Sequence, residues 1–284
     1  MAHRVIDADG HICEPRAVWT DYVVRRHRDR TIRVERDGDG QDWVWINGVQ
    51  RKNLPPAAAC IPSGMDDPKH MPSWDDILPG SYDGGARVKV LDEEGIERSL
   101  LYPSLYLLHG DIDDAEVAAA ACAGYNRWVA DMCRDGQGRL DAVGIVPLQS
   151  IDKAAAEVEH IARLGLKGVA FRPERYHGLA LSDERLTPFW ERVAGNGLFA
   201  AVHGSFGSLM PSFASSRYQN NFFVHMISIP SSRWRRRSTS SPAACSSAIP
   251  GSPSPSSNPG WAGSNTGSSA WTSISPPCAT PCRG

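Results

Sequence analysis

This sequence of 284 residues lacks long apolar runs and paired cysteines, and it has little net charge. No run of 18 or more apolar residues occurs, so we expect no transmembrane helix. The seven cysteines occur singly and form no C-x-x-C pair, which fits reduced thiols. The formal net charge is only -2, so nothing in the composition suggests nucleic-acid binding. Because a strand follows M-A-H-R directly, without a signal peptide, we expect a cytoplasmic protein.

The last 54 residues, Ser231–Gly284, lack most residue types from which a core is built. They contain no Leu, Val, Phe, Tyr, Asp or Glu, whereas 16 of them are Ser and eight are Pro. Five of the 30 basic residues and none of the 32 acidic residues lie there, so the preceding part has 25 basic against 32 acidic residues and a net charge of -7. One interpretation is a disordered tail, since the segment offers little apolar surface to bury.

We favour a second interpretation, in which the tail is translated out of frame. GC-rich codons that are read out of register yield mainly Ser, Pro, Arg, Ala, Gly and Thr. A shift of one base after Ser228 can restore a helix, an apolar strand and a second helix. We therefore hypothesise a single-base deletion at this point, and we divide the chain into a structured part, residues 1–228, and a low-complexity tail, residues 229–284.

The most informative stretch is V-I-D-A-D-G-H-I-C-E-P, which spans Val5–Pro15. A strand that begins at Val5 has Asp7, Asp9 and His11 at alternating positions, and alternating residues of a strand point to one face. A carboxylate oxygen and an imidazole nitrogen that converge at a strand end form half of a divalent-metal site. The alternative is that these side chains only cap a turn. The other half of a metal site has to come from elsewhere in the chain.

A regular alternation of strands and helices begins near Gly84. Apolar and amphipathic segments predict strands at 5–11, 98–102, 140–147, 166–173 and 198–204, and helices at 86–94, 115–134, 151–164 and 183–196. In the helix at 115–134 the apolar side chains recur at helical spacing, at Val117, Ala121, Tyr125, Trp128 and Met132. Such alternation implies parallel βαβ units. About five units fit, which leaves open a doubly wound sheet or the first five units of a (β/α)8 barrel. Before them we expect a helix at Arg16–Arg26 and a β-hairpin near 31–49.

His203, in V-H-G-S-F-G, ends the fifth predicted strand. The carboxyl ends of barrel strands face one mouth, so a barrel would bring His203 to Asp9 and His11 as a metal ligand. Arg172 ends the fourth predicted strand, where it could bind a substrate carboxylate or form a structural ion pair. His70 and Trp74 belong to a long Pro- and Asp-rich loop, where they could line the mouth of the barrel, although surface placement is the default expectation.

Four segments carry a resemblance to a known family: I-D-A-D-G-H-I-C-E-P, R-V-K-V-L-D-E-E-G-I-E-R-S-L-L-Y-P-S, K-G-V-A-F-R-P and V-H-G-S-F-G. They resemble the amidohydrolase superfamily, in the amidohydrolase-related branch that includes aminocarboxymuconate semialdehyde decarboxylase and related aromatic-acid decarboxylases. The resemblance extends from Val5 to about Ser228. Many members carry H-x-H on the first strand, where this chain has Asp9 and His11.

The resemblance implies a (β/α)8 TIM-type barrel, of which about the first five units are present. It implies one divalent metal ion, zinc in preference to manganese, held by Asp9, His11, His203 and an aspartate on the eighth strand that has no counterpart here. The implied activity is hydrolysis or decarboxylation of a small carboxylated or aromatic compound, with Arg172 as the candidate for substrate binding. A homo-oligomer stays open. The alternatives are a catalytically inactive, frameshifted fragment and a doubly wound binding protein without metal.

Overall fold

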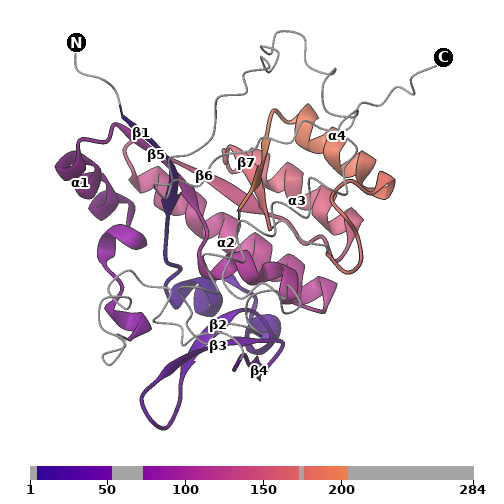
Figure 1. Ribbon diagram of the computed structural model, residues 1–284, viewed down its shortest axis with the longest axis horizontal. Coiled ribbons are helices and arrows are strands. Elements are labelled where there is room, and N and C mark those ends of the chain that lie inside the picture. The colour runs from indigo at the N-terminus through magenta and orange to yellow at the C-terminus, as the bar shows by residue number, and fades with distance from the viewer. Residues whose placement is uncertain (1–4, 53–72, 173–175, 204–284) are drawn as a thin grey trace, which may run out of the picture.

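A computed structural model describes residues 5–52, 73–172 and 176–203, and its centre is a curled parallel sheet (Figure 1). The strand order is β1-β5-β6-β7-β8, and all four neighbouring pairs are parallel. The strands are β1 (Ile6–His11), β5 (Arg98–Tyr102), β6 (Leu140–Ile145), β7 (Gly168–Phe171) and β8 (Phe199–Val202). All five predicted strands are therefore confirmed, each within two residues at either end.

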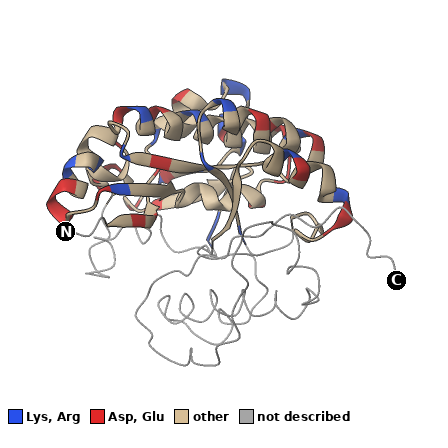
Figure 2. Ribbon diagram, turned by 90° about the horizontal axis from the view of Figure 1, so that it is seen from above, with Lys and Arg blue, Asp and Glu red and all other residues tan. Residues whose placement is uncertain are grey.

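The sheet has the strand order of a barrel. Each strand pairs with the next strand of the same sheet along the chain, whereas a doubly wound sheet reverses direction at a switch point. The α-helices lie together on one face of the sheet, as in the outer layer of a barrel, and charges of both signs are spread over them (Figure 2). These helices are α1 (Gly84–Glu94), α2 (Ala115–Asp135), α3 (Ile151–Arg163) and α4 (Thr187–Gly195). The prediction of the first five units of a (β/α)8 barrel is confirmed, and the doubly wound alternative is wrong.

Acidic and hydroxyl side chains start three of these helices. Asp83 accepts a hydrogen bond from Ala86 N at the start of α1, Asp114 accepts two at the start of α2, and Ser150 accepts one at the start of α3. Each bond satisfies an amide that has no partner within its helix. The apolar face of α2 is buried against the sheet as its spacing predicted, through Val117, Ala121, Tyr125, Trp128 and Met132. No helix in the described ranges combines the length and hydropathy that a membrane crossing requires.

The predicted hairpin forms a small separate sheet. Strands β2 (Arg33–Arg36) and β3 (Asp42–Ile46) are antiparallel, and a short strand β4 (Val49–Gln50) extends the pair to three. This insertion is joined to the main domain by Asn47, whose Nδ2 donates to Asp111 O at 3.0 Å. The turn at Asp37 is closed by its own carboxylate, which accepts from the backbone N–H groups of Asp39 and Gln41.

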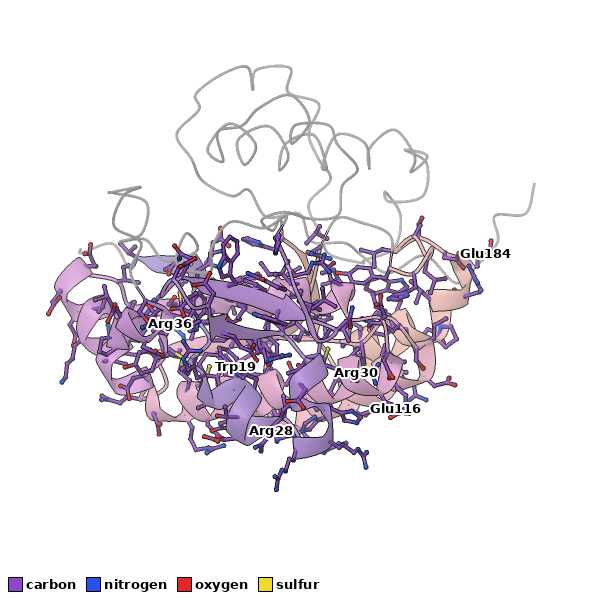
Figure 3. All side chains as sticks on the ribbon, turned by 90° about the horizontal axis from the view of Figure 1, so that it is seen from below. Trp19, Arg28, Arg30, Arg36, Glu116 and Glu184 are labelled. Carbon is purple, nitrogen blue, oxygen red and sulfur yellow. The ribbon has the colours of Figure 1, made fainter. Side chains whose placement is uncertain are left out.

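The helix predicted at Arg16–Arg26 is wrong. The chain forms a five-residue π-helix, η1 (Val18–Tyr22), becomes extended at Val23, and then forms a 3-10 helix, η2 (Arg25–Arg30). Two arginine side chains, one from α2 and one from η2, stabilise the break between the two short helices. Arg127 of α2 donates to Tyr22 O, and the Nε of Arg28 donates to Val23 O. Both short helices pack against α2, with Trp19 of η1 buried (Figure 3).

Two further differences concern the ends of predicted elements. The helix predicted at 183–196 begins with a 3-10 turn, η8 (Glu184–Leu186), and α4 follows with Pro188 in its first turn. Trp74 is not at the surface, because it is 1% exposed and its Nε1 donates to Glu14 O at 3.0 Å. It opens η5 (Trp74–Asp76), which precedes η6 (Pro79–Ser81). The preceding loop residues, with His70, lie outside the described ranges.

Candidate metal centre

Asp9, His11 and His203 come together at the carboxyl edge of the parallel sheet. One ligand atom of each residue lies within 4.8 Å of the other two. The Nε2 atoms of His11 and His203 are 3.0 Å apart, and Asp9 Oδ1 is 3.3 Å from His203 Nε2. The first two residues belong to β1 and His203 follows β8, so strands at opposite ends of the curled sheet supply the three groups. The structure thus brings together all three residues that the sequence nominated.

A β-bulge in β1 sets the direction of these side chains. Asp7 pairs with Ser99 of β5 and Gly10 pairs with Leu101, so β1 uses three residue steps where β5 uses two. One extra residue sends the side chains before it to the opposite face. The expectation that Asp7 shares the face of Asp9 is therefore wrong.

Asp7 is held on the side of the sheet that carries α1. Its Oδ2 accepts from Ser99 Oγ at 2.7 Å and lies 3.8 Å from the Arg87 guanidinium of α1. Gly10 makes this arrangement possible, since a Cβ at that position would lie 2.3 Å from Ser99 Oγ and 2.5 Å from Asp7 Oδ2. The carboxylate of Asp7 thus supports the bulge, and only the carboxylate of Asp9 reaches the histidines.

The imidazole of His11 is arranged to present Nε2. Its Nδ1 is 3.2 Å from Ser104 Oγ, and a hydroxyl that accepts from Nδ1–H leaves the lone pair on Nε2, facing His203. Although His11 keeps an exposed edge, partial desolvation of its ring and the charge that His203 can carry lower its pKa, whereas Asp9 and a hydrogen bond to the backbone of Pro103 act in the opposite direction. His11 is therefore neutral near pH 7, as a metal-ligating imidazole must be.

The donor set fits a divalent transition-metal ion. One carboxylate oxygen and two imidazole nitrogens are ligands that zinc, manganese and iron share. Two nitrogens at about 2.1 Å from one ion, at angles of roughly 90–109°, lie about 3.0–3.4 Å apart. The observed separation of 3.0 Å between the two Nε2 atoms agrees with this spacing.

Tyr102, the last residue of β5, forms one wall of the centre. The centroid of its ring lies 5.5 Å from that of His203 and 6.4 Å from that of His11. Burial raises the pKa of Tyr102, and the negative charge of Asp9 acts in the same direction. The phenol therefore stays protonated, and its ring lies beside the two histidines.

Glu14 is a buried carboxylate that the sequence analysis did not single out. It is fully buried, and burial raises its pKa to about 7 even though backbone N–H groups, including those of Ser104, Leu105 and Tyr106, lower it. These amides begin η7 (Leu105–Asp111), directly after β5. The available signal was an acidic residue enclosed by apolar neighbours in I-C-E-P, which is unusual for an exposed loop.

Arg172 lies at the same edge of the sheet, but deep in the protein. It follows β7, where the N–H of His203 donates to the neighbouring Phe171 O at 2.8 Å. Arg172 is 1% exposed and its guanidinium donates to the buried carboxylate of Asp111, which also lies 3.3 Å from Arg51. The structure therefore supplies the structural ion pair that was the alternative reading of Arg172. Binding of substrate by Arg172 stays a prediction.

His109 of η7 is a second buried group that the sequence did not reveal. Its Nδ1 is 2.8 Å from Tyr106 O, so Nδ1 carries the proton. Its Nε2 has no hydrogen-bond partner among the described residues. Burial lowers the pKa of His109 to about 4, and the positive charge of Arg172 contributes to the shift. Short-range sequence patterns hold no signal for this, because the burial depends on how η7 packs against α2 and how His109 lies against the ring of Tyr176.

Comparison with known proteins gives one family and a set of solved structures. The family described as Amidohydrolase matches residues 6–244. The amidohydrolase map2389c from Mycobacterium avium subsp. paratuberculosis K-10 is 26% identical with a TM-score of 0.58, over 72% of this chain and 60% of that chain. The apo form of IDCase from Metarhizium anisopliae is 18% identical with a TM-score of 0.55, over 83% of this chain and 60% of that chain. No curated protein matches the sequence. The chain thus spans about 60% of the length of both solved structures.

Proposed function

Because the chain belongs to the amidohydrolase family, we propose that it is a metal-dependent hydrolase or decarboxylase with Asp9, His11 and His203 as ligands of one divalent ion. Its substrate is a small carboxylated or aromatic compound. The observation that carries the proposal is the convergence of one carboxylate and two imidazoles within 4.8 Å at the carboxyl edge of a barrel-type sheet. Catalytic groups of barrel enzymes come from this edge.

A bound divalent ion supplies Lewis acidity, which lowers the pKa of bound water from 15.7 towards roughly 7 or polarises substrate oxygens. The residues of the chain prepare the site for this chemistry. The lowered pKa of His11 favours its neutral form, so its Nε2 is available as a ligand at neutral pH. Asp9 contributes the negative charge that balances part of the ion's charge, and the buried ring of Tyr102 packs beside His203.

Zinc is the ion that we favour, with manganese as the alternative. Imidazole nitrogen suits zinc well, and carboxylate oxygen suits both ions. Arg172 is the residue that we assign to a substrate carboxylate, because it directly follows β7 next to the strand that leads to His203. Asp111, the partner of Arg172, also pairs with Arg51. A substrate carboxylate could therefore bind the Arg172 guanidinium while Asp111 keeps its ion pair with Arg51. A cytoplasmic location and a homo-oligomer stay predictions.

A second candidate is a catalytically inactive, frameshifted fragment of such an enzyme. Two observations favour it. The composition of Ser231–Gly284 fits out-of-frame translation, and the fourth ligand that the family resemblance implies has no counterpart in the chain. Resequencing the gene across the Ser228 codon tests this directly. An intact frame that reads Ser-Ile-Pro-Ser would rule out the fragment explanation.

The metal proposal is tested by titrating the full chain with Zn²⁺ and Mn²⁺ in a calorimeter. Asp9→Asn removes a ligand, whereas Asp141→Asn changes the same residue type on β6, where the carboxylate pairs with Arg98. We expect Asp9→Asn to weaken binding on the order of 100-fold or more, and Asp141→Asn to stay within about threefold of wild type, since loss of a ligand exceeds the 10–100-fold effects of outer-shell changes. Equal effects of the two variants would contradict the ligand assignment.

Turnover separates the active enzyme from the inactive fragment. The chain as given and a frame-corrected chain are both loaded with metal and incubated with a panel of small aromatic carboxylates and amides. Activity in the given chain supports the first candidate, and activity only in the corrected chain supports the second. The release of carbon dioxide distinguishes decarboxylation from hydrolysis.

A further inference from the structure

Glu14 lies three residues after the ligand His11 and has no place in the ligand set. Both of its oxygens are used within the protein. Oε1 accepts from Ser104 N and Tyr106 N, both at 3.1 Å, and Oε2 accepts from Leu105 N at 2.9 Å. A carboxylate with no exposed surface is costly unless it is fully hydrogen-bonded, so this three-amide arrangement is what allows Glu14 to be buried.

The three amides are the free donors at the start of η7. Ser104 sits at the position before this helix, but its own side chain makes no capping bond there. Instead Glu14 supplies the cap from 90 or more residues away in sequence. The Ser104 hydroxyl is thereby left for another partner, and it lies 3.2 Å from His11 Nδ1.

The segment from His11 to Glu14 is itself held in place at several points. Arg87 of α1 donates to His11 O at 3.2 Å, Ile12 N donates to Tyr102 O at 3.1 Å, and Trp74 Nε1 donates to Glu14 O at 3.0 Å. These contacts fix the segment that carries both His11 and Glu14, and the carboxylate of Glu14 in turn fixes the backbone of Ser104.

We propose that Glu14 is a positioning residue for the metal ligand His11, acting through Ser104. Glu14 fixes the backbone of Ser104, so that the hydroxyl accepts from Nδ1–H of His11 and the lone pair stays on Nε2. Partners of this kind orient the ring of a metal-bound histidine and select its tautomer. The inference rests on the proposed metal site, which it extends from the three ligands to the group that supports one of them.

Two variants test the link, each with a matched control. Glu14→Gln keeps the shape but replaces one acceptor oxygen by a donor, and Ser104→Ala removes the hydroxyl. Glu157→Gln changes another buried carboxylate, which is bonded to Asn126 in α2, and Ser150→Ala removes a hydroxyl that is bonded to Lys153 N at the start of α3 instead of a ligand. The measurements are Zn²⁺ affinity by calorimetry and the tautomer of His11 by nitrogen-15 NMR of the metal-free full chain.

We expect Glu14→Gln and Ser104→Ala each to lower Zn²⁺ affinity about 10–100-fold, as outer-shell changes do, and to shift His11 from the Nδ1–H form to a mixture of tautomers. The Zn²⁺ affinity of the double variant should lie within about threefold of that of the weaker-binding single variant, because Glu14 acts on His11 through Ser104. Both controls should keep wild-type affinity within about threefold and leave the His11 tautomer unchanged.

The proposal is overturned if Glu14→Gln leaves both the affinity and the tautomer as in wild type, or if Ser104→Ala changes them and Glu14→Gln does not. Should Glu14→Gln fail to fold, Glu14→Asp is measured with the same expected direction, since it keeps the charge but shortens the reach. If the wild-type chain binds neither Zn²⁺ nor Mn²⁺, the proposed metal site fails. The tautomer measurement on the metal-free chain still decides the role of Glu14 in that case.

Discussion

Acidification should destabilise the protein through His109. This imidazole is fully buried, its Nδ1 donates to Tyr106 O, and burial together with Arg172 lowers its pKa from 6.5 to about 4. The unfolded chain takes up a proton near pH 6.5, whereas the folded chain resists it until about pH 4. Between these values the unfolded state binds more protons, so the free energy of unfolding falls as the pH falls through this window.

The size of the effect follows from the shift. A difference of about 2.5 pKa units at 1.36 kcal/mol per unit corresponds to about 3 kcal/mol, present in full above pH 6.5 and lost by about pH 4. His11 has a lowered pKa and acts in the same direction. Glu14 acts in the opposite direction, because its pKa is raised from 4.5 to about 7 and its buried charge costs stability as the pH rises through that range. A variant is therefore needed to isolate His109.

The assay is urea unfolding of the full chain, followed by tryptophan fluorescence at several pH values from 7.5 to 4. His109→Leu is compared with wild type, and His177→Asn, at an exposed position with a left-handed backbone, serves as the control. The stability of wild type minus that of His109→Leu should fall by about 3 kcal/mol over this range. The control should follow wild type throughout. A difference that stays constant within about 1 kcal/mol would refute the reasoning.

Two further predictions concern buried polar contacts. Asp111→Ala should lower the free energy of unfolding by about 3–5 kcal/mol, because it removes the buried carboxylate that pairs with the guanidinium groups of Arg172 and Arg51. Arg172→Met combined with Asp111→Leu should recover part of this loss in urea unfolding, and no recovery would contradict the charge argument. Gly10→Ala should lower the free energy of unfolding by about 1–3 kcal/mol and weaken Zn²⁺ binding, because the added Cβ would lie 2.3 Å from Ser99 Oγ within the bulge. Unchanged Zn²⁺ affinity would show that the bulge does not set the direction of Asp9.

The repeating part of the fold was predictable because its signals are local. Apolar runs bounded by helix caps predicted β5, β6, β7 and β8, and the spacing of Val117 to Met132 predicted the buried face of α2. The ligand candidates also followed from local patterns. Asp9 and His11 are close in sequence on one strand, and His203 ends another strand of the same parallel sheet. The carboxyl ends of parallel strands lie at the same edge of a sheet, so the sequence predicted that these three residues lie close together.

The errors arose where a distant partner decides a local conformation. Asp7 left the face of Asp9 because Ser99 and Arg87 hold it on the side of α1, and the resulting bulge cannot be seen in the alternation of β1. The predicted helix at Arg16–Arg26 broke at Val23, where Arg127 of α2 takes one of the freed carbonyls. Hydrogen bonds to residues about 90–105 positions away outweighed the local preference in both cases.

The sequence by itself determined the barrel-type alternation, the hairpin insertion and the three candidate ligands, because these depend on periodicity and on strand ends. Only the tertiary structure decided which carboxylate joins the histidines, the ion pair of Arg172 with Asp111, and the burial of Glu14 and His109. The physical reason is that burial and hydrogen-bond partners are properties of the packed chain. The pKa of Glu14 and the direction of the Asp7 side chain are set by neighbours that the linear order does not place beside them.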